Sequence, residues 1–512
     1  MRKFSIPAFG ESEFFENWEN RTARVWSVPH AAGLFEQYCA LYADNGYVKK
    51  EAYACGTHRY VALQKGSVGV FLNAFGGTDE LRIVEEENCN YFSYTDRVGE
   101  TLFAPQITQV KLGDYGMSYV IRLADGRFIV IDGGFIYDSD ADALHETLFA
   151  QSESKTPVIA AWILSHQHED HFHCFLRFTE KYADEVVIEK LLFNFPAHDD
   201  FGHYPELEKD NPKLSNSRAC VKIPELLAWI EKHDVPTFTP HTGQKYHIGD
   251  ANIEMLACMD DSIHVTQNGN ATSLVFRMEL GGQVILWTAD AGCSYVRLDE
   301  RYGDHLKADI LQIPHHGFQS GKAEAEIRIY DLVAAPVCLL PSDGYCAYTF
   351  FCIFREGTRH LMLADYTEEL IDGDEQRTLV LPYTARQGAR AKRMREMVLG
   401  LENNGARSFV FSGLNTGREE DLCFTLLNMT VLPVQVRVEL YFDGVRAMRN
   451  AAQVEIKGSS LKICRLTGGE NGVLAQDKSL PENANFAVRF LCDTPIVVSH
   501  QTRTAAYHSS LF

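Results

Sequence analysis

The sequence predicts an α/β domain that is flanked by a mixed α+β segment and by an all-β sandwich. Between residues 106 and 383, apolar strand-like runs alternate with helical stretches, which is typical of α/β domains. After residue 407, apolar side chains recur at every second position, which is typical of half-buried antiparallel strands. The expected boundaries are 1–104 for an accessory segment, 105–383 for the α/β domain, 384–406 for a linker helix and 407–512 for the sandwich.

The composition excludes some classes of protein. A chain of 512 residues is long enough for about three domains of roughly 150 residues each. Its hydrophobic content of 46% is ample for packed cores, which excludes disorder as the overall description. The 48 basic and 69 acidic side chains give a net charge of −21, which repels phosphate backbones over most of the surface. We therefore disfavour nucleic acid as a partner.

The cysteines and the apolar runs predict where the chain resides. Thirteen cysteines are scattered without a C-x-x-C pair, as expected in a reducing compartment. The first residues reach acidic side chains before an apolar segment can form, and the longest purely apolar stretches, such as 158–164, have about seven residues. We expect no secretory signal, no membrane span and a cytoplasmic location.

For the accessory segment, 1–104, the sequence predicts strands and a helix but no catalytic site. A helix is expected at 31–42, and the Gly76-Gly77 pair predicts a hairpin turn. The expected strands are 59–63, 69–73 and 80–84. Because no catalytic group of residues occurs here, we expect a cap or a sheet extension.

In the α/β domain, polar residues follow the strands at their ends, where α/β folds build their sites. The expected strands are 107–112, 119–123, 128–131, 158–164, 186–193, 253–257, 273–280, 283–288 and 310–313. The expected helices are 141–150, 172–182, 223–232 and 323–331.

In the linker, the sequence predicts a basic helix over 384–403, with Thr384 as its N-cap and Gly405 as the C′ residue that ends it. Its basic side chains are Arg386, Arg390, Lys392, Arg393 and Arg395. They indicate either an anion-binding patch or a solvated helix face, and the acidic character of the chain favours the solvated face. Beyond the linker, 434–442 alternates strictly between apolar and polar residues. Further strands are expected at 452–457, 461–466, 486–491 and 495–499.

A histidine-rich motif follows the apolar strand 158–164. The segment 165–171 reads SHQHEDH and places three imidazoles and a carboxylate at one strand end. Imidazole and carboxylate groups suit Zn²⁺ and similar divalent ions. We expect His166 and His168 to hold one ion, and Asp170 and His171 to hold a second.

Other strand ends supply the remaining groups that two ions need. The strand 283–288 is followed by Asp290, which we expect to bridge the ions. The strand 310–313 leads to His315 and His316, one of which closes the site. Asp132 follows 128–131, where we expect it to hydrogen-bond to a metal ligand and orient it without binding the metal itself.

These segments resemble the metallo-β-lactamase superfamily, an αββα sandwich of hydrolases, over about residues 105–345. Within it they are similar to the ComEC-like branch, which includes the hydrolase domain of a DNA-uptake channel and soluble esterases. The matching segments are QVKLGDYGMSYVIRLADGRFIVIDGG, SHQHEDH, NATSLVFRMELGGQVILWTAD and LKADILQIPHHG. The resemblance implies that the metal ligands are His166, His168, Asp170, His171, Asp290 and one of His315 and His316. The sequence does not decide between the last two, and our working assignment gives the metal to His315 and proton transfer to His316.

The segment TQNGNAT, 266–272, departs from the superfamily pattern, because a further histidine ligand is usual there. Asn268 or Asn270 takes that place, which implies that one ion has fewer ligands. The chain also offers His241, His247 and His264 as compensating histidines.

The resemblance implies a hydrolase with two divalent ions, zinc in the first place and manganese or iron as alternatives. Hydroxide shared by the ions would attack a phosphodiester or related ester, oriented by Asp170, with His316 as proton donor. A small-molecule phosphoester or ester is the favoured substrate, and nuclease activity is the less favoured one.

The C-terminal part has a resemblance of its own. Over about residues 408–505 it is similar to the β-sandwich of the sensory rhodopsin transducer family, through GLNTGREEDLCFTLLN, VQVRVELYFDG and DTPIVVSHQTR. This resemblance implies a ligand-binding module or a homo-oligomer formed through the sandwich. The alternative function is therefore a binding or sensory protein in which the metal site is structural or vestigial.

Overall fold

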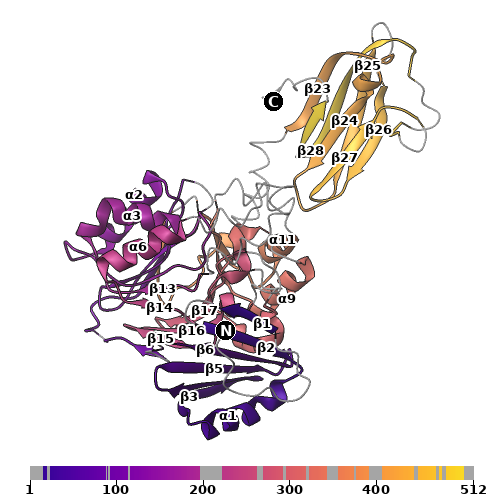
Figure 1. Cartoon of the computed structure of the whole chain (residues 1–512). Helices are drawn as coiled ribbons and strands as arrows, with labels where there is room; N and C mark the ends of the chain where they lie inside the picture. The colour runs from indigo at the N-terminus through magenta and orange to yellow at the C-terminus, as the bar shows by residue number, and fades with distance from the viewer. Residues whose placement is uncertain are drawn as a thin grey trace. The chain divides into compact units, whose positions relative to one another are not determined.

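A computed structural model gives the fold of the chain, and its parts are described one at a time (Figure 1). The described residues are 15–19, 23–87, 89, 93–97, 99–113, 116–195, 222–261, 269–291, 296–318, 322–342, 356–373, 376–390, 406–442, 448–468, 472–474 and 480–500. They divide into two compact units, one of Met1–Asp343 with His360–Arg386 and one of Gly344–Arg359 with Gln387–Phe512.

Two mixed sheets form the centre of the first unit. The first has the order β14-β13-β11-β10-β9-β8-β22, with β12 beside β11. Its strands are β8 (Gln106–Gln109), β9 (Ser118–Arg122), β10 (Phe128–Asp132), β11 (Val158–Ile163), β12 (Val187–Ile188), β13 (Leu191–Leu192), β14 (Thr237–Phe238) and β22 (Arg377–Val380). β10 and β11 run parallel, so their carboxyl ends, and the residues that follow them, lie at one edge.

The second sheet has the order β21-β20-β19-β18-β17-β16-β15-β7. Its strands are β7 (Tyr94–Thr95), β15 (Lys245–Ile248), β16 (Ala251–Ala257), β17 (Val275–Leu280), β18 (Gln283–Trp287), β19 (Ile310–Gln312), β20 (Val337–Leu339) and β21 (Glu369–Ile371). Strands β18, β19, β20 and β21 run parallel, so their carboxyl ends also share an edge.

The two sheets pack face to face, with helices outside. Their facing side chains, among them Ile131, Ile163, Trp287 and Ile310, form one buried core. A second core lies between the first sheet and helices α2 (Asp138–Gln151), α3 (His173–Tyr182) and α6 (Ile223–His233). The other helices here are α8 (Leu298–Tyr302), α9 (Ala323–Val333) and α11 (Glu356–Leu363). This arrangement confirms the predicted αββα sandwich.

The N-terminal part adds an antiparallel sheet of order β1-β2-β6-β5-β4-β3. Its elements are β1 (Phe15–Glu19), β2 (Ala23–Pro29), α1 (Phe35–Asp44), β3 (Val48–Cys55), β4 (His58–Lys65), β5 (Val68–Phe75) and β6 (Glu80–Glu86). The hairpin expected at Gly76-Gly77 joins β5 to β6. One face packs under α1, and the other hydrogen-bonds to the chain before β15, where Tyr53 donates to Gly243 O at 2.6 Å and Asn73 to Thr242 O at 3.0 Å. The sheet is therefore built into the first unit.

Two of the elements predicted before residue 406 differ in the structure. The strand expected at 186–193 is broken into β12 and β13. Thr384 is not a helix N-cap, because 383–386 is non-helical and helix begins at 389. Paired hydrogen bonds hold this segment, since Gln283 bonds both the N–H and the carbonyl of Tyr383, at 2.6 and 2.9 Å. The rest of the expected linker helix, with Gly405, lies outside the described residues.

The second unit contains antiparallel strands around its own core. They are β23 (Ala406–Asn415), β24 (Cys423–Asn428), β25 (Val434–Phe442), β26 (Met448–Ile456), β27 (Ser460–Arg465) and β28 (Asn485–His500). The alternation predicted for 434–442 matches β25, in which Val434, Val436 and Val438 are buried. β28 replaces two predicted strands, pairing early with β23 and β25 and later with β24. Among the described helices of both units, none is long and apolar enough to cross a membrane.

Candidate metal centre

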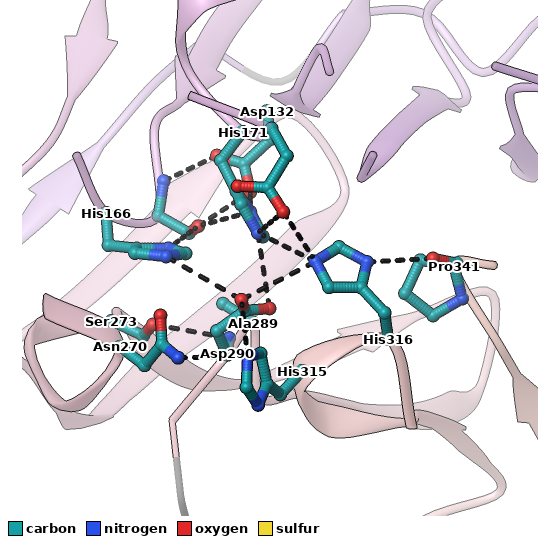
Figure 2. Close-up of polar contacts among 12 residues, drawn as sticks. Asp132, His166, His171, Asn270, Ser273, Ala289, Asp290, His315, His316 and Pro341 are labelled. Carbon is teal, nitrogen blue, oxygen red and sulfur yellow. Dashed lines mark hydrogen bonds and ion pairs between the residues drawn. The ribbon is translucent and has the colours of Figure 1, made fainter. Parts of the chain in front are cut away.

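Residues that follow strands of both sheets meet at one edge of the sandwich (Figure 2). The segment 165–171 follows β11, and Asp132 is the last residue of β10. From the second sheet, Asp290 follows β18 and the His315-His316 pair follows β19. The edge thus brings together side chains that are far apart in the sequence.

Four side chains form the larger group of metal-competent donors: Asp170, His171, Asp290 and His316. Their donor atoms all lie within 4.8 Å of one another. Nε2 of His316 is 3.1 Å from Oδ2 of Asp170 and 3.5 Å from Oδ2 of Asp290. Nε2 of His171 is 3.2 Å from Oδ1 of Asp290. We call these residues the four-donor group.

Three side chains form a smaller group beside it: His166, His168 and Asp290. Asp290 belongs to both groups, so its two oxygens can serve two ions. Nε2 of His166 is buried without a hydrogen-bond partner and lies 3.8 Å from Oδ2 of Asp290. We call these residues the three-donor group.

In three of the histidines, a hydrogen bond at Nδ1 holds the ring in place. The other ring nitrogen, Nε2, therefore faces the donor group to which the histidine belongs. Nδ1 of His171 donates to Oδ2 of Asp132 at 2.8 Å, and Nδ1 of His316 donates to the carbonyl of Pro341 at 2.8 Å. Oγ of Ser165 donates to Asp132 at 2.6 Å, so at 3.1 Å it accepts from Nδ1 of His166. When its Nε2 carries no proton, each ring therefore presents the lone pair of Nε2 to the group, as a metal-binding imidazole does.

The electrostatics of the two groups fit a cation. Burial, helped by neighbouring imidazoles, lowers the pKa of His166 well below its ordinary value, which keeps the ring neutral. Burial also acts downward on His316, but Asp290 and Asp170 raise its pKa to about 9. Burial would raise the pKa of Asp290, yet His171 and His316 hold it well below its usual range. The buried carboxylates thus require positive charge, which protons or divalent ions can supply.

The backbone is strained where it presents these side chains. Asp132, Ala289, His315 and His316 all have positive φ, between 45° and 54°. Non-glycine residues in this region cost about 1–3 kcal/mol each, and such strain is concentrated at functional sites. A hydrogen bond of 3.0 Å from His315 N to Ala289 O holds two of the strained turns together.

The two adjacent histidines occupy different environments. The side chain of His316 is 1% exposed and belongs to the four-donor group. The side chain of His315 is 25% exposed, and its Nε2 lies 3.9 Å from Asp290 and 3.0 Å from Nδ2 of Asn270. The donor groups found among the described residues include His316 and leave His315 outside.

Of the compensating histidines, the two that the structure describes, His241 and His247, do not join these groups. Nδ1 of His241 is 2.5 Å from Asp260, and the pair is buried together with Glu86. His247 contacts Asn252. His264 and Asn268 lie outside the described residues.

Sequence reasoning missed some of the supporting contacts. The hydroxyl of Ser165 bonds both Asp132 and His166, although serine in the motif gave no specific signal for this role. The carbonyl of Pro341 anchors His316, and no side-chain pattern can announce a backbone acceptor. The orientation of Asn270 toward His315 depends on the fold of 269–272, which the sequence pattern did not predict.

Residues 113–338 match the model of the metallo-beta-lactamase superfamily and form a domain of that superfamily. This region contains every donor named above. Among the curated proteins, none matches the chain.

Several solved structures are similar to parts of the chain. The metallo-beta-lactamase fold protein YhfI from Bacillus subtilis is 16% identical, covering 54% of this chain and 99% of that one, with a TM-score of 0.31. Human tRNase Z, short form, is 11% identical over 54% of this chain and 99% of that one, with a TM-score of 0.30. The Anabaena sensory rhodopsin transducer is 18% identical over 19% of this chain and 83% of that one, with a TM-score of 0.17.

Proposed function

We propose, from the metallo-β-lactamase superfamily domain at residues 113–338, that this chain is a metal-dependent hydrolase with two divalent ions. The observation that carries the proposal is the pair of donor groups that share Asp290. In both groups, anchored imidazoles present Nε2 toward buried carboxylates. This donor chemistry suits zinc first, with manganese and iron as alternatives.

The residues divide into ligands and substrate-facing groups. His166, His168 and Asp290 would hold one ion, and the four-donor group would hold the other. The burial of His316 among carboxylates supports a ligand role for it, and the exposure of His315 supports a substrate-facing role, so we exchange the two working assignments. When bound, the ions supply positive charge for a substrate oxygen and a nucleophilic water at neutral pH.

The substrate class that we propose is a phosphodiester or a related ester. The resemblance of the motifs to the ComEC-like branch favours phosphodiesters. The net charge of −21 favours a small molecule over duplex nucleic acid. Asp170 supports this chemistry, because its side chain is 13% exposed, more than the other three donors, and its carboxylate can orient a water at the four-donor group.

A binding role for the C-terminal sandwich is the second candidate. Leu461 and Ile463 are 58% and 55% exposed on β27, which ends the strand order of its sheet. Exposed apolar side chains on an edge strand favour contact with another protein or another copy. Sedimentation of the chain with both residues changed to lysine tests assembly, and an unchanged sedimentation coefficient contradicts it.

The double variant Asp170→Ala, His171→Ala tests the hydrolase proposal. It removes two donors of the four-donor group, so we expect the loss of one metal equivalent and of ester hydrolysis, with the fold intact. The matched control is Asp142→Ala, His145→Ala on α2. Both side chains are partly exposed and hydrogen-bonded, the ring of His145 also stacks on Phe149 and Tyr182, and neither residue belongs to a donor group. Retained turnover in the site variant, with turnover also retained in the control, contradicts the proposal.

A further inference from the structure

The two donor groups are unequal. Because Asp290 is shared, the four-donor group has three donors of its own and the three-donor group has two. Affinity for a divalent ion rises with the number and charge of its ligands, and the only carboxylate that is not shared, Asp170, belongs to the larger group. The smaller group therefore needs a further donor if it is to hold an ion well.

The amide of Asn270 lies beside the smaller group. In Figure 2, Asn270 is drawn between the His166 ring and the His315 ring. Nδ2 of Asn270 is 3.0 Å from Nε2 of His315, and an amide nitrogen can only donate, so the ring nitrogen accepts. This bond fixes the direction of the amide, with Nδ2 toward His315 and the carbonyl oxygen on the other branch. The residue is 8% exposed, so its amide is placed in the interior of the site.

The backbone around Asn270 is fastened to the turn that carries His166 and His168. Oγ1 of Thr272 donates to Oε1 of Gln167 at 2.8 Å, and Leu274 N donates to Ser165 O at 2.9 Å. Gly269 lies so near His168 that a Cβ there would fall inside contact distance of Nε2. Asn270 therefore keeps its position relative to the two imidazoles.

We propose that the side-chain oxygen of Asn270 is the additional ligand of the three-donor group, and that this group is the weaker of two metal positions. This inference rests on the proposed function, since it assumes that the two groups bind ions. An amide oxygen is uncharged, unlike a carboxylate, and it is a weaker donor to zinc-like ions than an imidazole nitrogen, so it adds less affinity than either would. The chain then fills its four-donor group first and its Asn270 position second.

Titration of the metal-free full chain with Co²⁺ alone, followed by electronic absorption, tests the order of filling. We expect two equivalents, with dissociation constants about tenfold or more apart. Asn270→Ala should weaken only the second equivalent, by about 10–100-fold, the range typical of a lost contact at a metal site. Asn270→Asp, which adds a charge at the same size, should tighten the second equivalent, so the proposal stays testable even if the alanine variant fails to fold. Asn252→Ala, an exposed asparagine on β16, is the matched control and should leave both constants unchanged.

The outcomes separate this inference from the proposed function. Two equivalents of equal affinity, or an Asn270→Ala variant whose constants both stay unchanged or weaken together, would overturn the inference while leaving a dinuclear hydrolase in place. A chain that binds no Co²⁺ at all would overturn both.

Discussion

Asp132 accepts a hydrogen bond of 2.8 Å from Nδ1 of His171, although the two residues leave different strands of the first sheet. The same carboxylate accepts from the backbone N–H of Ser165 at 2.7 Å and from its hydroxyl at 2.6 Å. Asp132 is fully buried and has a positive φ of 54°. The carboxylate of Asp132, carried by a strained backbone, thus orients both the backbone of the 165–171 motif and the ring of His171.

Asp132→Asn should weaken metal binding without removing a ligand. Asparagine fits the size and tolerates positive φ, but it lacks the negative charge that supports the Nδ1–H of His171. We expect the affinity for the tighter equivalent to fall by about 10–100-fold in a calorimetric Zn²⁺ titration. Asp421→Asn, at a buried aspartate of the sandwich, serves as control. Equal affinities in the two variants would show that Asp132 does not orient the ligand.

Gly269→Ala should disturb the three-donor group through sterics alone. The added Cβ would meet Nε2 of His168 and lie 2.8 Å from Nε2 of Gln167. Either ring or turn must move, so we expect a weaker second metal equivalent and slower hydrolysis. Gly33→Ala is the control, because a Cβ there meets nothing within 4 Å. Normal Co²⁺ binding by the Gly269 variant would mean that the turn adapts freely.

The buried pair of His241 and Asp260 predicts how stability depends on pH. Burial lowers the pKa of His241, but Asp260 and Glu86 raise it to about 10. A raised pKa in the folded state gives stability that is fully present below the ordinary histidine value of about 6.5 and is lost as the pH rises through 10. Because removing one partner of a buried pair leaves the other charge uncompensated, His241→Ala should lower the free energy of unfolding by about 3–5 kcal/mol at pH 7.

Urea unfolding of the wild type and of His241→Ala between pH 6 and pH 10.5 measures this difference. The gap between the two proteins should shrink as the pH approaches 10. A gap that stays constant over this range would show that the pair does not titrate there.

The parts of the site that follow from local sequence were predictable, and those that depend on distant backbone were not. The motif 165–171 and Asp290 follow apolar strands of two different sheets, β11 and β18. Each therefore lies at the carboxyl end of a strand, and the predicted face-to-face packing of the sheets brings the two ends together. The choice between His315 and His316 depends on positive φ at both residues, which no residue type there announces. Thr384 looks like an N-cap, but hydrogen bonds from Gln283, a hundred residues earlier, keep the segment non-helical.

In the C-terminal sandwich, too, some strands could be predicted from the sequence and others could not. The alternation of 434–442 marked β25 because one face of that strand is buried. β28 runs on through Thr494-Pro495, where the residue pattern suggested a break, because different neighbours pair with its two halves. Partner strands far away in sequence therefore decided where this element ended.

Metal content of the purified chain, measured by elemental analysis together with turnover of bis-p-nitrophenyl phosphate in added Zn²⁺ or Mn²⁺, tests the central claim most directly. The shared position of Asp290 between two donor groups predicts about two equivalents of metal and turnover that depends on them. Protein that holds no metal and shows no turnover under either ion would contradict the hydrolase and leave the binding role of the sandwich.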